Sequence, residues 1–326
     1  MSTTMHYRPQ AHRVVAVVLL LLVAGAGFAL DDNAGALILP EGGSSSLPWW
    51  VYPILLFVTT FALGVIAVMG GVGGGVLFVP IVSGFFPFHI DFVRCAGLLI
   101  ALTGSLSAGP GLLRKGLASF RLALPAALLA SAAAIGGAML GLALPTNVVE
   151  ISLGAAILGI AVLFVAAANR SEYPTVATAD RLSTVLRING LYTEESSNQE
   201  INWKVHRTVP GFLLFLGIGV IGGMFGLGAG WATIPVLNLV INAPLKISAA
   251  TSSFLISITG TTGAWVYVNQ GALLPILVVP SLVGMFLGAR LGGVLLPKVK
   301  PSIVRVAVII LLIIAGLRSL LKGLGV

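Results

Sequence analysis

Charged residues and cysteines are scarce in this chain, and each scarcity excludes a class of protein. Asp, Glu, Lys and Arg make up 9% of the residues, against about 25% in a typical soluble protein. The low charge therefore argues against an ordinary soluble domain. The single cysteine, Cys95, excludes an intramolecular disulfide and a cysteine metal cluster. HExxH and GxSxG motifs are absent, and the four histidines fall in expected tails or loops (His6, His12, His89 and His206). The sequence therefore predicts neither an enzyme nor a bound cofactor.

Long apolar runs take the place of the missing charge. Hydrophobic residues make up 57% of the chain, and residues 42–90, 122–149, 208–245 and 247–289 contain no Asp, Glu, Lys or Arg. A membrane span needs roughly 20 apolar residues, so each run holds one to three spans. The net charge of +8 is better explained by positive residues on the cytoplasmic side than by a nucleic-acid partner. The chain is predicted to be an integral membrane protein.

The chain divides into four parts. Residues 1–48 hold an amino-terminal hydrophobic segment, either an uncleaved transmembrane helix or a signal peptide, followed by an external loop. Residues 49–168 and 208–326 form two transmembrane halves. Residues 169–207 form a polar linker, expected on the cytoplasmic side. Alternation of apolar and polar residues at 186–188 and 201–205 predicts a β-hairpin in this linker, with a flexible tether as the alternative.

A glycine-rich motif occurs once in each half. Gly71–Pro80 reads GVGGGVLFVP and Gly226–Pro235 reads GLGAGWATIP. Glycine and proline interrupt helices and free backbone groups that lipid cannot satisfy, so such breaks are tolerated only where protein or a water-filled cavity covers them. Paired interruptions at corresponding places in two halves are the best sequence indication of a transporter's substrate site.

The halves also align outside the motif. Thr103-Gly104 matches Thr259-Gly260, and Pro125 matches Pro280. The sequence therefore predicts an all-α polytopic membrane protein with two repeats of about five hydrophobic segments each, containing glycine-broken helices, after an amino-terminal hydrophobic helix. With a cytoplasmic amino terminus, most of the basic residues lie inside and the second repeat is inverted relative to the first. Smaller glycine pairs are expected only to permit close helix packing: Gly137 with Gly141, and Gly288 with Gly292.

The two motifs, the Ala-Ala-Thr-Ser-Ser run at residues 249–253 and the duplication resemble the sulfite exporter TauE/SafE family (toluene sulfonate uptake permeases). The resemblance covers residues 49–321. It implies transport of sulfur-containing anions such as sulfite, sulfoacetate or other organosulfonates. The first repeat departs from the pattern, because Cys95-Ala96-Gly97 stands where the second has Thr251-Ser252-Ser253.

The physical interpretation of the breaks also favours an anion. A half-helix that begins at a break presents unpaired N–H groups and a partial positive charge. The residues expected to bind substrate are those that open the half-helices or follow them, and their hydroxyl-bearing neighbours: Gly73, Gly74, Gly75, Gly228, Ala229, Gly230, Trp231, Asn238, Thr251, Ser252, Ser253 and Cys95. Alternatively, the glycines serve packing alone, and Asn238 caps its half-helix. The other hydroxyls of these spans, including those of Thr103 and Thr259, either touch substrate or bond only to their own helix.

Few charged residues lie near the membrane. Arg94 and Lys246 either steer anions or anchor the helix ends, and Arg290 either attracts an anion or snorkels to the headgroups. Acidic residues are absent from the middle of the predicted spans, so the sequence shows no carboxylate proton relay and leaves the coupling ion open. The predicted function is export of a small sulfur-containing anion across the plasma membrane by alternating access. The alternatives are a passive anion channel and a permease for a non-sulfur organic anion. The direction of transport and the oligomeric state stay open.

Overall fold

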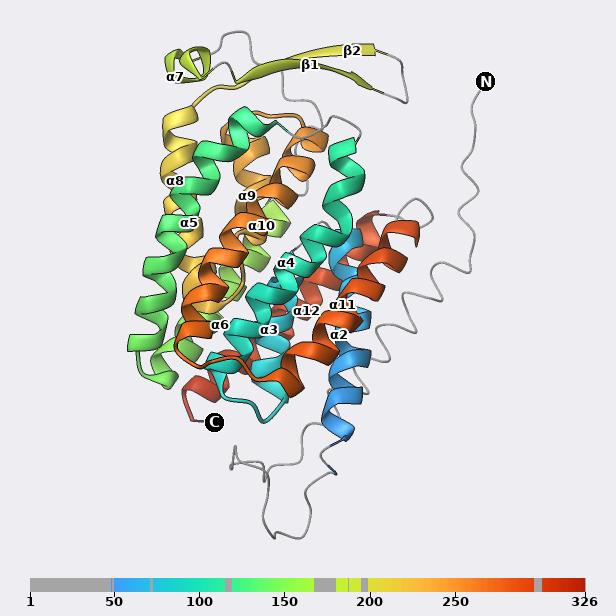
Figure 1. The fold of residues 1–326 in the computed structure, drawn as a ribbon, viewed down its shortest axis with the longest axis vertical. Helices are drawn as coiled ribbons and strands as arrows, with labels where there is room; N and C mark the ends of the chain where they lie inside the picture. Colours follow the sequence, from blue (N-terminus) through green and yellow to red (C-terminus); the bar gives the residue numbers. More distant parts are fainter. Residues whose placement is uncertain are drawn as a thin grey trace.

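The computed structural model describes residues 48, 50–70, 73–114, 119–166, 180–186, 188–194, 199–295 and 301–325. The described chain is a bundle of helices with one small hairpin at its end (Figure 1). In chain order, the elements are α2 (Val51–Gly70), α3 (Gly74–Phe85), α4 (Ile90–Arg114), α5 (Phe120–Ala143), α6 (Thr146–Ala166), α7 (Arg181–Val185), β1 (Asn189–Glu194), β2 (Gln199–Lys204), α8 (Thr208–Phe225), α9 (Gly230–Pro235), the π-helical η2 (Val236–Val240), α10 (Leu245–Asn269), α11 (Pro275–Leu295) and α12 (Pro301–Gly323).

Seven of the described helices are long and apolar enough to span a membrane: α2, α4, α5, α6, α8, α11 and α12. Helix α10 is longer than most of them at 25 residues, but its many Ser and Thr side chains make it more polar. The predicted all-α polytopic membrane fold is confirmed. The predicted amino-terminal segment, residues 14–30, lies outside the described residues.

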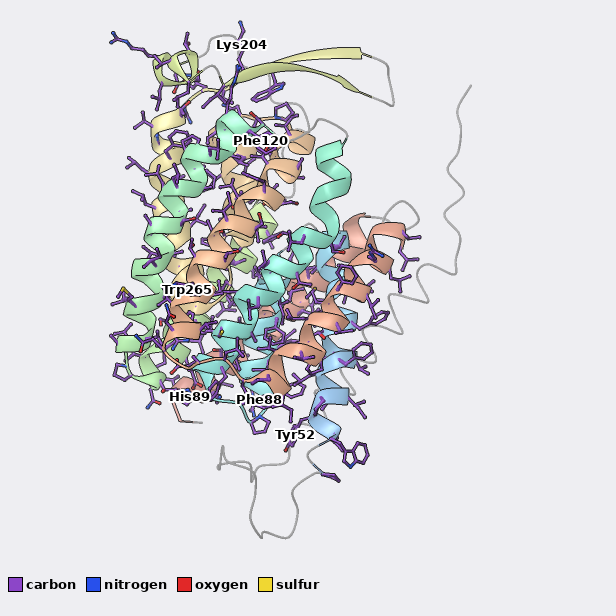
Figure 2. All side chains as sticks on the ribbon, viewed as in Figure 1. Tyr52, Phe88, His89, Phe120, Lys204 and Trp265 are labelled. Carbon is purple, nitrogen blue, oxygen red and sulfur yellow. The ribbon has the colours of Figure 1, made fainter. Side chains whose placement is uncertain are left out.

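The chain reverses direction at each glycine break. The rings of Tyr52 at the start of α2 and Phe88 just after α3 lie 6.0 Å apart. In the other half, the His206 N–H before α8 donates to Ile241 O after η2 at 3.0 Å. Each short helix therefore returns to the end of the bundle from which the preceding long helix started. Tyr52 and Phe88 lie at one end of the bundle and Lys204 at the other (Figure 2).

Small residues let long helices of opposite halves pack in parallel. A Cβ on Gly288 of α11 would lie 2.1 Å from Phe61 O of α2, and one on Gly292 would lie 2.7 Å from Val65 O. Helices α5 and α8 meet in the same way, because a Cβ on Gly137 would lie 2.2 Å from Val220 O. These contacts leave no room for a side chain. Helix α2 thus packs on α11, and α5 packs on α8.

The linker forms an antiparallel hairpin at one end of the bundle (Figure 1). Strand β1 pairs with β2, with Asn189 opposite Lys204 and Glu194 opposite Gln199. The first strand starts after the predicted 186–188 segment, because α7 ends at Val185 and Leu186 belongs to the turn that follows it. The second strand overlaps the predicted 201–205 segment.

Candidate functional site

The two short helices begin against each other in the interior of the bundle. Gly73 precedes α3, and Gly230 is the first residue of α9. A Cβ on Gly230 would lie 3.0 Å from the Cα of Gly73, and a Cβ on Gly73 would lie 3.3 Å from the Cα of Gly230. The amino-terminal ends of two helices, one from each half, are therefore in backbone contact. Each end carries N–H groups that have no partner within their own helix.

The turn before α9 depends on two glycines with left-handed backbone conformations. Gly226 has φ 72° and Gly228 has φ 68°, a region that residues with a Cβ enter only at a cost. The Gly226 N–H donates to Gly223 O at 3.4 Å and the Gly228 N–H donates to Gly222 O at 3.2 Å, and these bonds satisfy carbonyl groups at the carboxyl end of α8. Gly228 is thus required for the chain reversal that brings Ala229 and Gly230 to α3.

Gly74 and Gly75 lie in crowded positions on α3. A Cβ on Gly75 would lie 2.7 Å from Gly97 O and 2.9 Å from Leu227 O. A Cβ on Gly74 would lie 2.6 Å from the Met285 methyl group. These two glycines allow α3 to pack closely against its neighbours.

Two buried polar groups, one on α9 and one on the neighbouring α10, lack hydrogen-bond partners within the described part of the chain. They are the indole N–H of Trp231 and the hydroxyl of Ser252, a residue that is 2% exposed. Ile256, one turn after Ser252 on α10, lies 3.0 Å from the Cβ position of Gly230, which places this face of α10 beside the start of α9. A buried polar group without a partner costs about 1–3 kcal/mol. A ligand that accepts hydrogen bonds would remove this cost.

Other predicted polar residues already have partners. Thr251 Oγ1 accepts from the Ser119 N–H at 3.2 Å, and Ser253 Oγ donates to Ala249 O at 3.3 Å. Asn238 Nδ2 donates to Ala243 O at 2.9 Å, which ties down the loop after η2. Several further hydroxyls bond to their own helix, as the alternative interpretation expected: Thr103, Ser105, Thr259, Thr261 and Thr262.

Cys95 and Trp231 pack in different parts of the hydrophobic core. Cys95 is fully buried in a small cluster that includes Leu98 and Tyr267. Trp231 packs against the two larger clusters. Trp231 and the face of α10 that carries Ser252 therefore lie at the break in the second half, whereas the Cys95 side chain packs in the cluster of Leu98 and Tyr267.

Arg94 is buried, which its position near a helix end did not predict. The residue is 1% exposed. It forms an ion pair with Asp91, donates to Met224 O at 3.0 Å and lies 5.4 Å from the Tyr267 ring centre. The Tyr267 hydroxyl also donates to Met224 O, at 3.0 Å. Together they cap the carboxyl end of α8, where the helix dipole favours a cation.

Of the two other residues expected to steer anions, the structure describes the side chain of Arg290 and not that of Lys246. Arg290 is exposed on α11, and its guanidinium lies 4.8 Å from the centre of the Phe286 ring. This position on the outer surface agrees with the snorkelling alternative. The side chain of Lys246 lies outside the described part of the chain.

The fold and the site together define a class: a polytopic α-helical membrane protein with two broken helices that meet at their amino-terminal ends, an arrangement typical of secondary transporters. The family model for the sulfite exporter TauE/SafE matches residues 55–319. The chain therefore belongs to this family of membrane transporters.

Two curated proteins are similar to this chain over shorter regions. The probable membrane transporter protein YunE of Bacillus subtilis (strain 168) is 27% identical over 107 residues, which are 33% of this chain and 39% of that protein. Sulfite exporter TauE/SafE family protein 6 of Arabidopsis thaliana is 30% identical over 130 residues, which are 39% of this chain and 30% of that protein. The chain thus spans less than half the length of each curated relative. No solved structure matches it.

Proposed function

We propose that this protein exports a small sulfur-containing anion, such as sulfite or an organosulfonate, by alternating access. The observation that carries the proposal is the contact of Gly73 and Gly230, which places two helix amino termini against each other inside the bundle. Each terminus contributes N–H donors and a partial positive charge. Sulfite and sulfonate groups present oxygen acceptors in several directions, which suits donors that converge from two halves. The names of the family and of the Arabidopsis relative agree with this substrate class.

The side chains beside the break add donors of the right kind. Ser252 and Trp231 each hold a buried polar group without a partner in the described residues. An oxyanion between the half-helices would accept from both groups and remove the cost of burying them. The indole ring of Trp231 would also provide an apolar surface for the carbon chain of an organosulfonate.

The proposed motion follows from which helices pack together. In the inverted-repeat interpretation, α2 corresponds to α8 and α5 to α11, and the observed pairs are α2 with α11 and α8 with α5. Exchange of the two halves converts one pair into the other, as a pseudo-two-fold axis requires. Since α3 and α9 come from different halves, rocking of the halves would open the site first to one face and then to the other.

The membrane potential can drive the proposed export. Moving one negative charge out of a cell that is negative inside releases about 2.3 kcal/mol per 100 mV. The buried or half-buried acidic residues of the described spans are Asp91, in the first turn of α4, and Glu150, in the second turn of α6; they pair with Arg94 and Lys322. We therefore propose that the charge of the substrate itself couples export to the membrane potential.

Thermal unfolding of the purified protein with a panel of anions tests the proposal. We expect sulfite or a sulfonate to raise the melting temperature more than acetate or chloride does, because a ligand of the folded state stabilises it by mass action. The sharper test is Ser252→Ala. It should raise the melting temperature without ligand, because it removes an unsatisfied buried hydroxyl. It should weaken anion binding by about tenfold to a hundredfold, since a hydrogen bond to a charged group contributes about 1.5–3 kcal/mol.

Ser281→Ala is the matched control. Ser281 is fully buried on α11, and its hydroxyl also lacks a partner in the described residues. This variant should gain similar stability and keep wild-type anion binding. Equal anion responses in the two variants would remove Ser252 from the site. If wild-type protein responds to none of the anions, the proposed substrate class is wrong. A flux into proteoliposomes that does not saturate with anion concentration would favour the channel alternative.

A further inference from the structure

The backbone donors where the two short helices meet carry no full charge. Hydrogen bonding within α3 begins with the Val76 N–H, which donates to Gly73 O at 3.0 Å. Within α9 it begins with the Thr233 N–H, which donates to Ala229 O at 3.3 Å. The N–H groups that precede Val76 and Thr233 in these helices have no partner within their own helix. They are free to bind an anion as neutral donors.

The side-chain donors beside the helix starts are neutral as well. They are the hydroxyl of Ser252, a residue that is 2% exposed, and the indole N–H of Trp231, and neither has a partner in the described residues. Packing alone does not account for them, because a buried polar group without a partner is costly. They are independent support for a ligand at this place.

The positive potential at the site comes from the two helix dipoles. Helix α3 has 12 residues, and α9 continues directly into η2, so that the second helical segment runs from Gly230 to Val240. Each helix start carries about half an elementary charge, so the two together supply about one positive charge.

The one buried cation among the described Lys and Arg side chains is Arg94, and it is already neutralised. It forms an ion pair with Asp91 and donates to Met224 O at 3.0 Å. It therefore adds no net charge to the interior of the bundle.

Two further cations lie at the far end of α3. The Arg318 Nε donates to Gly84 O at 3.2 Å, and the Lys322 Nζ donates to Ser83 O at 2.8 Å. These carbonyl groups belong to the last turns of α3, about 15 Å along the axis from its start. Both side chains cap the carboxyl end of α3, away from the site.

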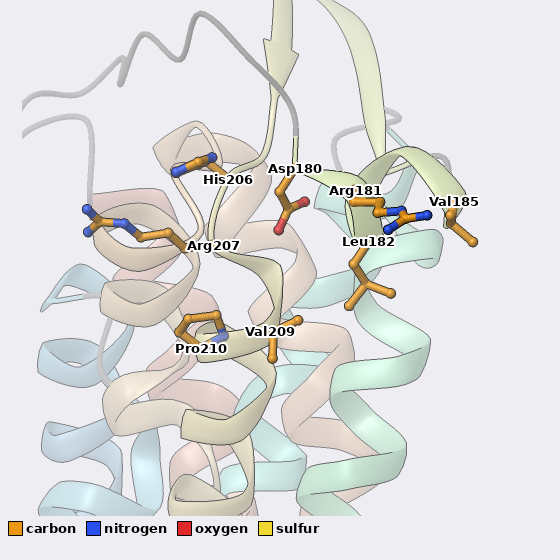
Figure 3. Close-up of a pocket in the computed structure, with 8 residues that line it drawn as sticks. All are labelled: Asp180, Arg181, Leu182, Val185, His206, Arg207, Val209 and Pro210. Carbon is orange, nitrogen blue, oxygen red and sulfur yellow. The ribbon is translucent and has the colours of Figure 1, made fainter.

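The arginines next to the linker are also distant from the helix starts. Arg181 and Arg207 line a pocket of about 640 Å³ where the linker meets α8, and their guanidinium groups point away from each other on either side of Asp180 (Figure 3). The His206 N–H beside them donates to Ile241 O, just beyond the end of the segment that starts at Gly230. That segment separates this pocket from the site by about 16 Å. The remaining described cations are exposed: Arg121, Lys204 and Arg290.

We infer, on the basis of the proposed function, that the transported anion carries a single negative charge. About one positive charge from the helix starts balances a monoanion such as hydrogen sulfite or an alkanesulfonate. A dianion such as sulfate or sulfoacetate would keep one uncompensated negative charge inside the bundle, which is costly. Sulfite would then be carried in its protonated form, and organosulfonates with a second acidic group would be excluded.

Binding of methanesulfonate and methylphosphonate to the purified wild-type protein, measured by calorimetric titration across neutral pH, tests this inference. The two ligands have similar shapes, but methanesulfonate stays a monoanion, whereas methylphosphonate loses a second proton near neutral pH. Methanesulfonate should bind equally well throughout, and it controls for titration of the protein itself. Methylphosphonate should bind at mildly acidic pH and bind about tenfold more weakly once it is a dianion, because its second charge has no counterpart in the site.

Ser252→Ala is the control variant, because it removes a neutral donor and no charge. It should weaken the binding of both ligands and keep the pH dependence of methylphosphonate binding. If methylphosphonate binds as tightly or more tightly as a dianion, the inference of a single charge is wrong and the proposed function still stands. If methanesulfonate, methylphosphonate and sulfite all fail to bind at every pH, the proposed function itself is wrong, and the inference falls with it.

Discussion

The ion pair of Asp91 and Arg94 should be asymmetric: loss of the more exposed partner should cost more stability than loss of the buried one. The Arg94 side chain is 2% exposed and that of Asp91 is 28% exposed. Asp91→Asn leaves a buried cation whose remaining acceptor is Met224 O, and whose Nε has no partner in the described residues. Removing one partner of a fully buried pair costs about 3–5 kcal/mol. Since Asp91 is partly hydrated and Asn retains a neutral acceptor, we expect a loss of about 2–3 kcal/mol.

Arg94→Met should cost about 1 kcal/mol or less. It removes the buried charge together with its unpaired Nε, and Asp91 can then be hydrated. Met224 O keeps the hydrogen bond from the Tyr267 hydroxyl. The penalty for breaking a buried pair is the cost of a charge left buried without its partner, and the Asp91 side chain is 28% exposed. The double variant should therefore resemble Arg94→Met alone, with a coupling energy of about 2 kcal/mol between the two sites.

The single cysteine provides the assay. Cys95 is fully buried, so a thiol-reactive fluorophore reports unfolding without any engineered label. Denaturant or thermal unfolding of the wild type and the three variants completes the cycle. Labelling at low temperature checks that no variant exposes Cys95 locally in its folded state. A loss in Arg94→Met as large as that in Asp91→Asn, or additive losses in the double variant, would refute this account of the cluster.

Three further outcomes are expected. Gly137→Ala should lower the free energy of unfolding by about 1–3 kcal/mol through overpacking, since its Cβ would lie 2.2 Å from Val220 O. Gly136→Ala has nothing within 4 Å of its Cβ and should raise the free energy of unfolding by up to about 1 kcal/mol through helix propensity. Thermal melting of the two neighbouring variants tests this difference. Lys322→Met should lower the free energy of unfolding by about 2–4 kcal/mol. It removes the Lys322 Nζ that lies 2.9 Å from the buried Glu150 carboxylate and that donates to Ser83 O at 2.8 Å. A variant that unfolds like the wild type would contradict this role of Lys322. Burial raises the pKa of Asp180, but hydrogen bonds from Ser183 and Thr208 outweigh burial and hold that pKa below its ordinary value. The stability that Asp180 provides over Asp180→Asn should therefore be complete at neutral pH and decline as the pH falls below about 4, so a difference that does not depend on pH would contradict it.

The sequence was sufficient for the features that depend on local composition. Charge-free runs predicted the spans, because burying charge in lipid is costly at any position along the chain. The glycine motifs predicted the broken helices, because left-handed residues such as Gly226 and Gly228 are a local requirement of the turn. The polar alternation of residues 201–205 indicated a strand at that place.

Contacts between distant residues were beyond such reasoning. The spans are apolar on most sides, so their periodicity does not say which faces meet, and the parallel pairing of α2 with α11 could not be read from it. Arg94 looked like a residue at a helix end, and its burial depends on Met224 and Tyr267, far away in the sequence. Ser252 is one of three adjacent hydroxyl residues, and the sequence does not distinguish them. The structure does, because Thr251 and Ser253 have hydrogen-bond partners and the Ser252 hydroxyl has none in the described residues.

The parallel pairing of α2 with α11 and of α5 with α8 also determines how the chain can be divided. A cut in the linker would produce two fragments, each keeping helices whose glycine-lined faces match a helix of the other fragment. Neither fragment could bury those faces alone, so each should be unstable in the membrane by itself. Expressed together, the two should find each other, since the surfaces that hold them are already complementary and need no connecting chain. The covalent linker would then serve mainly to keep the two halves in equal number and to set the orientation of the second half.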